Sequence, residues 1–106
     1  MFEFARDVRY FIKRIPESDA NLEDSRQLIR ASGSAGANYI EANNALGKKD
    51  FLMRLRISRK EARESRLFLR LIDIGDSEDL ETERARLVGE SQELTAILGS
   101  IISKSE

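Results

Sequence analysis

The apolar residues of this chain recur at three- and four-residue steps along most of its length. The clearest run follows a 4-3-4-3-4-3 spacing: Phe51, Leu55, Ser58, Ala62, Ser65, Leu69 and Ile72. A later run repeats the spacing: Leu80, Arg84, Leu87, Ser91, Leu94, Leu98 and Ile101. Because an α-helix has about 3.6 residues per turn, each run lies on one helical face. Both segments are therefore predicted to be amphipathic helices, and no segment sustains the alternation typical of a strand.

Three breaker signals, at Pro16, Gly47 and Gly75, divide the chain into four helical pieces. The first piece has this apolar stripe, widened by two phenylalanines: Ala5, Val8, Ile12 and Ile15, with Phe4 and Phe11. It must stop near Pro16, and the residues suited to cap the next helix are Ser18, Asp19 and Asn21. Helices of about 20 residues joined by short turns pack antiparallel. The pattern thus predicts an all-α protein, an antiparallel up-and-down four-helix bundle in a single domain over residues 1–106.

The segment RQLIRASGSAGANYIEANN, residues 26–44, is unusually rich in small residues. A phosphate-binding loop is one interpretation, but no lysine follows Gly33 or Gly36 and no strand precedes them. We interpret the segment as a helix whose small residues allow other helices to come close. Each glycine costs a helix about 1 kcal/mol relative to alanine, and close packing would offset that cost. The small residues could form a seam inside one bundle. The helix nevertheless lacks a broad polar face, which favours a covering second subunit.

The third helix carries a second apolar line besides its main one: Met53, Ile57, Leu67, Phe68 and Leu71, interrupted by Glu61 and Glu64. So much apolar surface in water would be unusual. It therefore predicts a subunit contact, unless the ends of the chain cover it. The candidate helix-packing or oligomer-interface residues are Ser32, Gly33, Gly36, Tyr39, Ile40, Ile57 and Phe68.

The net charge of −1 conceals a strong gradient along the chain. Residues 48–73 hold nine basic and four acidic side chains, whereas residues 74–106 hold three basic and eight acidic ones. Within the basic segment, five arginines spaced 3-4-3-4 form one helical stripe: Arg56, Arg59, Arg63, Arg66 and Arg70. Arginine presents a planar, permanently charged fork that suits phosphate oxygens, so the stripe is a candidate nucleic-acid-binding surface. The alternative is pairing with glutamates of the last helix, namely Glu81, Glu83, Glu90 or Glu93.

The chain contains no histidine and no cysteine. It therefore lacks the commonest acid–base group, the thiol nucleophile and the usual zinc ligands. Glu41, Glu61 and Glu64 could be imagined as metal ligands, but di-iron bundles also require histidines. We expect no catalytic residue, metal, cofactor or small-molecule substrate, and hence no enzyme.

Charged residues begin early in the chain, with Glu3, Arg6, Asp7 and Arg9 inside the first eleven positions. Such a segment cannot be the apolar region of a signal peptide. No uncharged run approaches the roughly 18 residues that a membrane helix needs. We therefore expect a soluble cytoplasmic protein without a membrane partner.

Four motifs resemble a known family: QLIR (27–30), GANYIEA (36–42), KKDF (48–51) and KEARES (60–65). Over about residues 8–75 the chain resembles the four-helix-bundle proteins encoded in intervening sequences of bacterial large-subunit ribosomal RNA genes. It departs from that pattern at Gly47, where many members have a helix-capping serine, and near Phe68, where tryptophan is common.

The resemblance implies an up-and-down bundle that assembles into a ring of five. A related protein, the accessory variability determinant of diversity-generating retroelements, is a basic pentamer that binds a reverse transcriptase and nucleic acid. The slightly acidic net charge of this chain differs from that relative. The expected partners are thus other copies of the chain, with RNA or a nucleic-acid enzyme bound through the basic third helix. The alternative is a structural protein–protein interaction module without nucleic-acid binding.

Overall fold

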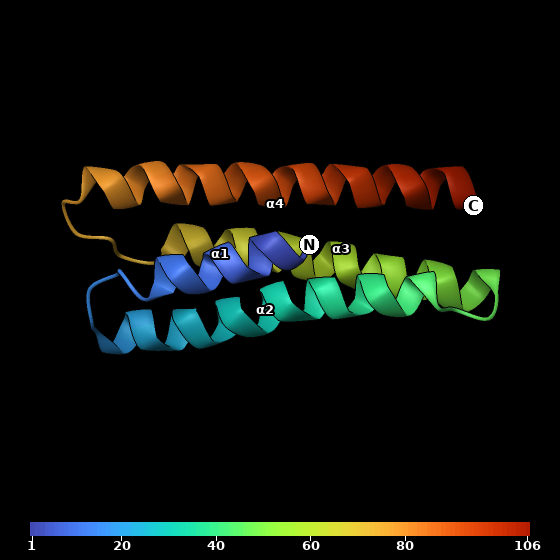
Figure 1. The fold of residues 1–106 in the computed structure, drawn as a ribbon, viewed down its shortest axis with the longest axis horizontal. Helices are drawn as coiled ribbons and strands as arrows, with labels where there is room; N and C mark the ends of the chain where they lie inside the picture. The colour runs from blue at the N-terminus through green and yellow to red at the C-terminus, as the bar shows by residue number, and fades with distance from the viewer.

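A computed structural model describes all residues of the chain, Met1–Glu106. It contains four helices and no strand: α1 (Phe2–Ile12), α2 (Asp19–Asn43), α3 (Lys48–Leu71) and α4 (Glu78–Ser105). Consecutive helices run in opposite directions along an elongated body (Figure 1). The predicted all-α, antiparallel four-helix bundle is confirmed.

The first helix ends before Pro16, as predicted. Helix α1 has 11 residues, whereas α2, α3 and α4 have 25, 24 and 28, so the N-terminus lies near the middle of the bundle (Figure 1). It packs against α2 and α4, while α3 lies between the same two helices on the other side. One half of the molecule therefore contains four helices and the other half only three.

The helix boundaries follow from capping residues. Ser18 caps α2 by accepting a hydrogen bond from the backbone N–H of Asn21 at 3.0 Å, and Ser77 caps α4 through Leu80 at 3.2 Å. Gly47 precedes α3 and provides no side-chain cap, as its sequence predicts. Between α3 and α4, Gly75 has a φ of 67°, a conformation that favours glycine.

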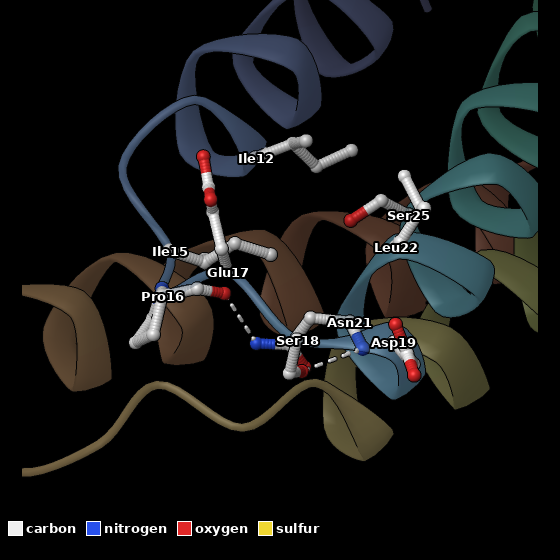
Figure 2. A pocket seen from close by; sticks show the side chains of 9 residues that line it. All are labelled: Ile12, Ile15, Pro16, Glu17, Ser18, Asp19, Asn21, Leu22 and Ser25. Carbon is white, nitrogen blue, oxygen red and sulfur yellow. Dashed lines mark hydrogen bonds between the residues drawn. The ribbon is translucent and has the colours of Figure 1, made fainter.

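Asn21 was predicted as a helix cap, but its buried side chain joins two loops instead. Its amide nitrogen donates to the carbonyl oxygens of Pro16, at 2.9 Å, and Asp73, at 2.8 Å. Its oxygen accepts from the backbone N–H of Asp73 at 3.0 Å. Figure 2 shows the bond to Pro16 at the rim of a pocket between the first two helices. Asn21 thus links the α1–α2 loop to the α3–α4 loop.

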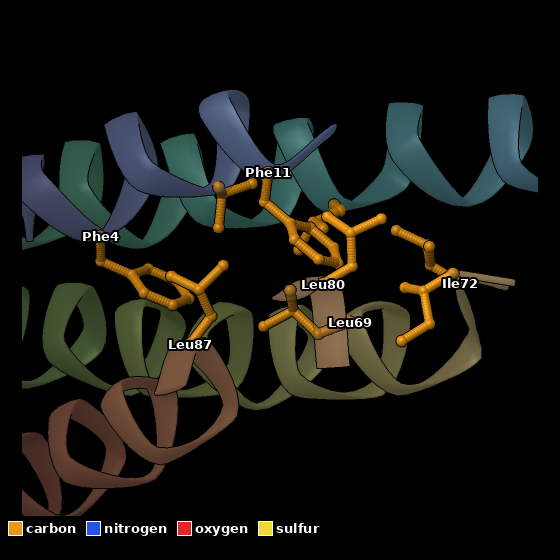
Figure 3. Close-up of a cluster of buried hydrophobic side chains, with 9 residues drawn as sticks. Phe4, Phe11, Leu69, Ile72, Leu80 and Leu87 are labelled. Atoms are coloured by element: carbon orange, nitrogen blue, oxygen red, sulfur yellow. The ribbon is translucent and has the colours of Figure 1, made fainter. Parts of the chain in front are cut away.

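Two separate hydrophobic cores fill the bundle. The larger lies under α1 and is built from nine buried side chains, among them Phe4, Phe11, Leu69, Ile72, Leu80 and Leu87 (Figure 3). The smaller lies in the three-helix half: Ala42, Leu52, Leu55, Leu98 and Ile102. Small buried residues separate the two: Ala31, Ser32, Ala35, Ser58, Ala62, Ser65 and Ser91. We call this the small-residue waist.

At the waist α2 and α3 approach closely enough for Ser58 to donate a hydrogen bond to the carbonyl oxygen of Ala35 at 2.7 Å. Most predicted core positions of α3 and α4 are indeed buried. The exceptions are half-buried: Phe51, Arg84, Leu94 and Ile101. At the three-helix end, Leu52 and Ile102 are buried more deeply than their predicted neighbours Phe51 and Ile101. A straight helix of 3.6 residues per turn drifts away from a 3.5-residue repeat, which accounts for these shifts.

Candidate nucleic-acid interface

The arginine stripe (Arg56, Arg59, Arg63, Arg66 and Arg70) lies on the side of α3 next to α4. By helical rise it extends for about 21 Å. Arg56 forms the stripe's one ion pair, at 3.2 Å from Glu106. The other four arginines form no ion pair. Arg56, Arg63 and Arg70 are exposed, and Arg59 and Arg66 are half-buried. The predicted alternative, pairing with Glu81, Glu83, Glu90 or Glu93, does not occur within the chain.

The reason is that α4 turns a largely uncharged face toward the stripe. A carbon placed as Cβ on Gly99 would lie 3.7 Å from the guanidinium of Arg59, and Val88 lines a shallow pocket with Arg70. Helical spacing places Gln92 and Thr95 between these two contact points. Acidic residues occur on this face only near the ends of α4, at Glu81 and Glu106. The centre of the stripe therefore has no carboxylate partner.

Two other acidic residues of α4, Glu83 and Glu90, pair with Arg86, which also bonds α1. Arg86 bonds Glu83, Glu90 at 2.7 Å and Asp7 of α1 at 3.1 Å. The hydrogen bond to Glu83 is the main cause that raises the pKa of Arg86 further above its normal value. Burial alone would raise the pKa of Asp7, but hydrogen bonds from Arg86 and Arg6 lower it below its ordinary value. This network fixes α1 to α4 and leaves the stripe unneutralised.

A second network occupies the opposite side of α3. Arg30 of α2 donates to Glu64 at 2.8 Å and to Glu61 at 3.0 Å. The hydrogen bond to Glu64, followed by the charge of Glu61, raises the pKa of Arg30. Glu61 is only 5% exposed, so Arg30 compensates a buried carboxylate. These two glutamates therefore have a structural partner, and α3 has one neutralised flank and one basic flank.

The residues predicted to pack helices or join subunits fall into two groups. Ser32 belongs to the waist, and Phe68 packs against the larger core of its own chain. The others lie at the surface or are half-buried, and Tyr39 also packs against the smaller core. Gly33, Gly36, Tyr39 and Ile40 line a groove of about 830 Å³ between α1 and α2, together with the exposed Phe2. Ile57 is half-buried on the outer side of α3. The close helix approach expected at the glycines is absent within the chain.

Replacing Gly36 with alanine should therefore stabilise the chain by about 0.5–1 kcal/mol. A Cβ there would approach no atom closer than the Cβ of Met1 at 3.9 Å, and alanine favours helix more than glycine does. Urea melts of Gly36→Ala and of Gly89→Ala, whose Cβ would meet nothing within 4 Å, measure this effect. A lower midpoint for Gly36→Ala alone would indicate that another copy packs against the glycine.

No group of three or more acidic residues is arranged to hold a metal ion. None of the four helices is both long and apolar enough to cross a membrane.

Two features of the structure were not predicted from the sequence: the uncharged face of α4 and the joining of two loops by Asn21. The charge total of α4 suggested pairing with the stripe, whereas its charges are sorted by face. The spacing of Val88, Gln92, Thr95 and Gly99 was the signal that could have revealed the uncharged face. The joining of two loops by Asn21 left no such signal, since Asp73 is 52 residues away.

A family model described as 23S rRNA-intervening sequence protein matches residues 1–100 of the chain. The fold is similar to the 1.70 Å crystal structure of a protein with unknown function from the S23 ribosomal protein family of Bacteroides thetaiotaomicron VPI-5482. The two chains are 29% identical and superpose with a TM-score of 0.78, over 95% of this chain and 93% of the other. No curated protein matches the chain. The family resemblance carried by the four sequence motifs is confirmed.

Proposed function

Since the chain belongs to the 23S rRNA-intervening sequence protein family, we propose that it is a non-catalytic, self-associating scaffold that binds RNA through the arginine stripe. The observation that carries the proposal is the absence of carboxylate partners for Arg59, Arg63, Arg66 and Arg70 beside an uncharged face of α4. Arginines that form ion pairs within the chain would contribute to its stability. Unpaired arginines on one stripe remain available to phosphate oxygens.

Self-association is the second part of the proposal. Supporting it are the groove between α1 and α2, floored by small residues, and the exposed apolar side chains on both sides of it, such as Phe2 and Ile40. A ring of five is the stoichiometry that the family resemblance implies. Repetition of the stripe around a ring would let weak phosphate contacts add through multivalency.

The chemistry of the stripe favours binding without base specificity. It presents guanidinium groups and no aromatic side chain on which a base could stack. Contacts should therefore go to phosphates, and affinity should fall steeply as salt rises because each contact releases counterions. A nucleic-acid enzyme that carries a bound RNA could reach the same surface.

Replacing Arg63 and Arg70 together by glutamate should weaken RNA binding by about tenfold or more while changing stability little. Both side chains are exposed and form no ion pair, so the substitutions remove no folded-state partner. Fluorescence anisotropy with a structured RNA, at low and at moderate salt, measures binding, and a urea melt of the same variant measures stability. Arg59 is a poorer choice because its guanidinium packs near Gly99.

The matched control reverses two charges elsewhere, at Arg26 and Lys104, and changes the net charge by the same amount. Both residues are exposed. Arg26 forms one long ion pair, at 3.9 Å from Glu23, and Lys104 forms none. Equal loss of binding in both double variants would show that total charge, and not the stripe, governs binding. No binding by the parent protein at low salt would favour the structural module without nucleic acid.

A further inference from the structure

The outward face of α3 carries a second heptad-like seam whose apolar side chains are exposed or half-buried and whose Glu64 is bonded by Arg30 of α2. Its positions follow a 4-3-4-3-4 spacing: Met53, Ile57, Lys60, Glu64, Leu67 and Leu71. Helical geometry places them opposite the buried positions of α3. Met53, Leu67 and Leu71 are 44%, 51% and 55% exposed, which is high for such apolar side chains. We call these six residues the outer seam.

The outer seam is symmetric about its midpoint at Ala62. Lys60 and Glu64 lie two residues on either side of that point, Ile57 and Leu67 lie five, and Met53 and Leu71 lie nine. In an antiparallel pair of identical helices, each residue faces the one related to it through the midpoint. Apolar positions then meet apolar positions.

The charges satisfy the same symmetry. Each Lys60 would face Glu64 of the second copy, twice in one contact. Within the chain these two side chains are only loosely paired, at 3.9 Å, and Lys60 is largely exposed. A parallel arrangement in register would instead place Lys60 against Lys60 and Glu64 against Glu64. The seam is thus complementary to itself in one orientation.

We infer that two copies of this chain associate back to back through the outer seams of α3, antiparallel and about a twofold axis that is level with Ala62 along the helix. This contact deepens the proposed self-association but is independent of RNA binding. It differs from a ring contact, which joins unlike surfaces, whereas a twofold contact joins the same surface on both copies. On its own this contact produces a dimer. If it links two rings of five, it produces an assembly of ten copies.

The geometry has a further effect on the arginine stripe. The stripe lies about a quarter turn from the outer seam on α3. A twofold axis between antiparallel helices keeps the same side of both helices facing the same way. Two arginine stripes therefore lie side by side on one face of the pair, which doubles the number of stripe arginines available to one RNA.

Charge reversal tests the contact. Lys60→Glu gives a chain with two acidic central positions, and Glu64→Lys gives one with two basic central positions. Each alone should associate through the seam at least about tenfold more weakly than the parent, because two like-charged pairs replace two opposite ones. An equimolar mixture should restore association, with one copy of each variant in every pair. Native mass spectrometry resolves the mixed species by mass.

Three controls keep the result unambiguous. Lys104→Glu makes the same charge change on an exposed residue of α4 and should leave the copy number unchanged. A urea melt checks Glu64→Lys, which loses a bond to Arg30. If that variant unfolds, Leu67→Lys replaces it, and should halve the copy number without unfolding the chain because Leu67 is exposed.

An even copy number that falls by half in Lys60→Glu and returns in the mixture supports the twofold contact. An odd copy number in the parent, or one unaffected by Lys60→Glu, overturns it. A parent that forms five copies would leave the proposed ring intact while removing this contact. Binding of RNA by the same samples is measured separately, so failure of the contact and failure of the proposed function are distinguishable.

Discussion

Phe11→Ala should lower the free energy of unfolding by about 3–5 kcal/mol. Phe11 is only 1% exposed and lies in the larger core with Leu69 and Leu80 (Figure 3). Truncation removes buried apolar surface and leaves a cavity that neighbouring side chains fill incompletely. The cost falls on a helix with few other anchors, because α1 has 11 residues and buries only three of them.

Phe2→Ala is the matched control, since it makes the same truncation on a side chain that is 75% exposed. Its free energy of unfolding should stay within about 0.5 kcal/mol of the parent value. Urea melts at low protein concentration measure both. Similar midpoints for the two variants would contradict the placement of α1 on the larger core.

Asn21→Ala should lower the free energy of unfolding by about 2–4 kcal/mol. The substitution removes three hydrogen bonds and leaves two carbonyl groups and one N–H without partners. A buried polar group left unsatisfied costs about 1–3 kcal/mol, and water can recover part of that at the ends of the bundle. The helix cap itself would remain, because Ser18 provides it.

Asn43→Ala provides the comparison, as Asn43 is exposed on the same helix and joins no loop. It should leave the midpoint of a urea melt almost unchanged. If Asn21→Ala behaved the same way, the two loops would have to be held together by the packing of Ile72 and Ile74 alone.

The fold followed from the sequence because its main signals are local. Apolar spacing marked the buried faces of α3 and α4, and Pro16 and Gly75 marked two of the turns. The length of α1 did not follow. The same stripe of apolar residues continues through Ile12 and Ile15, although the helix ends at Ile12. Pro16 sets only an upper limit for this helix, which ends four residues before it.

The residues of the candidate site could be predicted from the sequence, but the side chains that surround them could not. The 3-4-3-4 spacing of the arginines placed them on one side of α3. Whether they had partners depended on the rotation of α4 about its own axis. That rotation is set by Leu87, Ser91 and Leu98, which turn inward together and carry the glutamates toward α1 or solvent. Total charge per segment could not reveal it.

The small-residue waist has a consequence for how this sequence can change over time. Alanine and serine side chains fill the waist, and the two cores form separate clusters of buried apolar side chains. Substitutions in separate cores should then act independently, with free energies that add within about 0.3–0.5 kcal/mol. Residues of the smaller core can be substituted without compensating substitutions in the larger core under α1. Divergence within such a chain is modular, although its helices run without interruption from one end to the other.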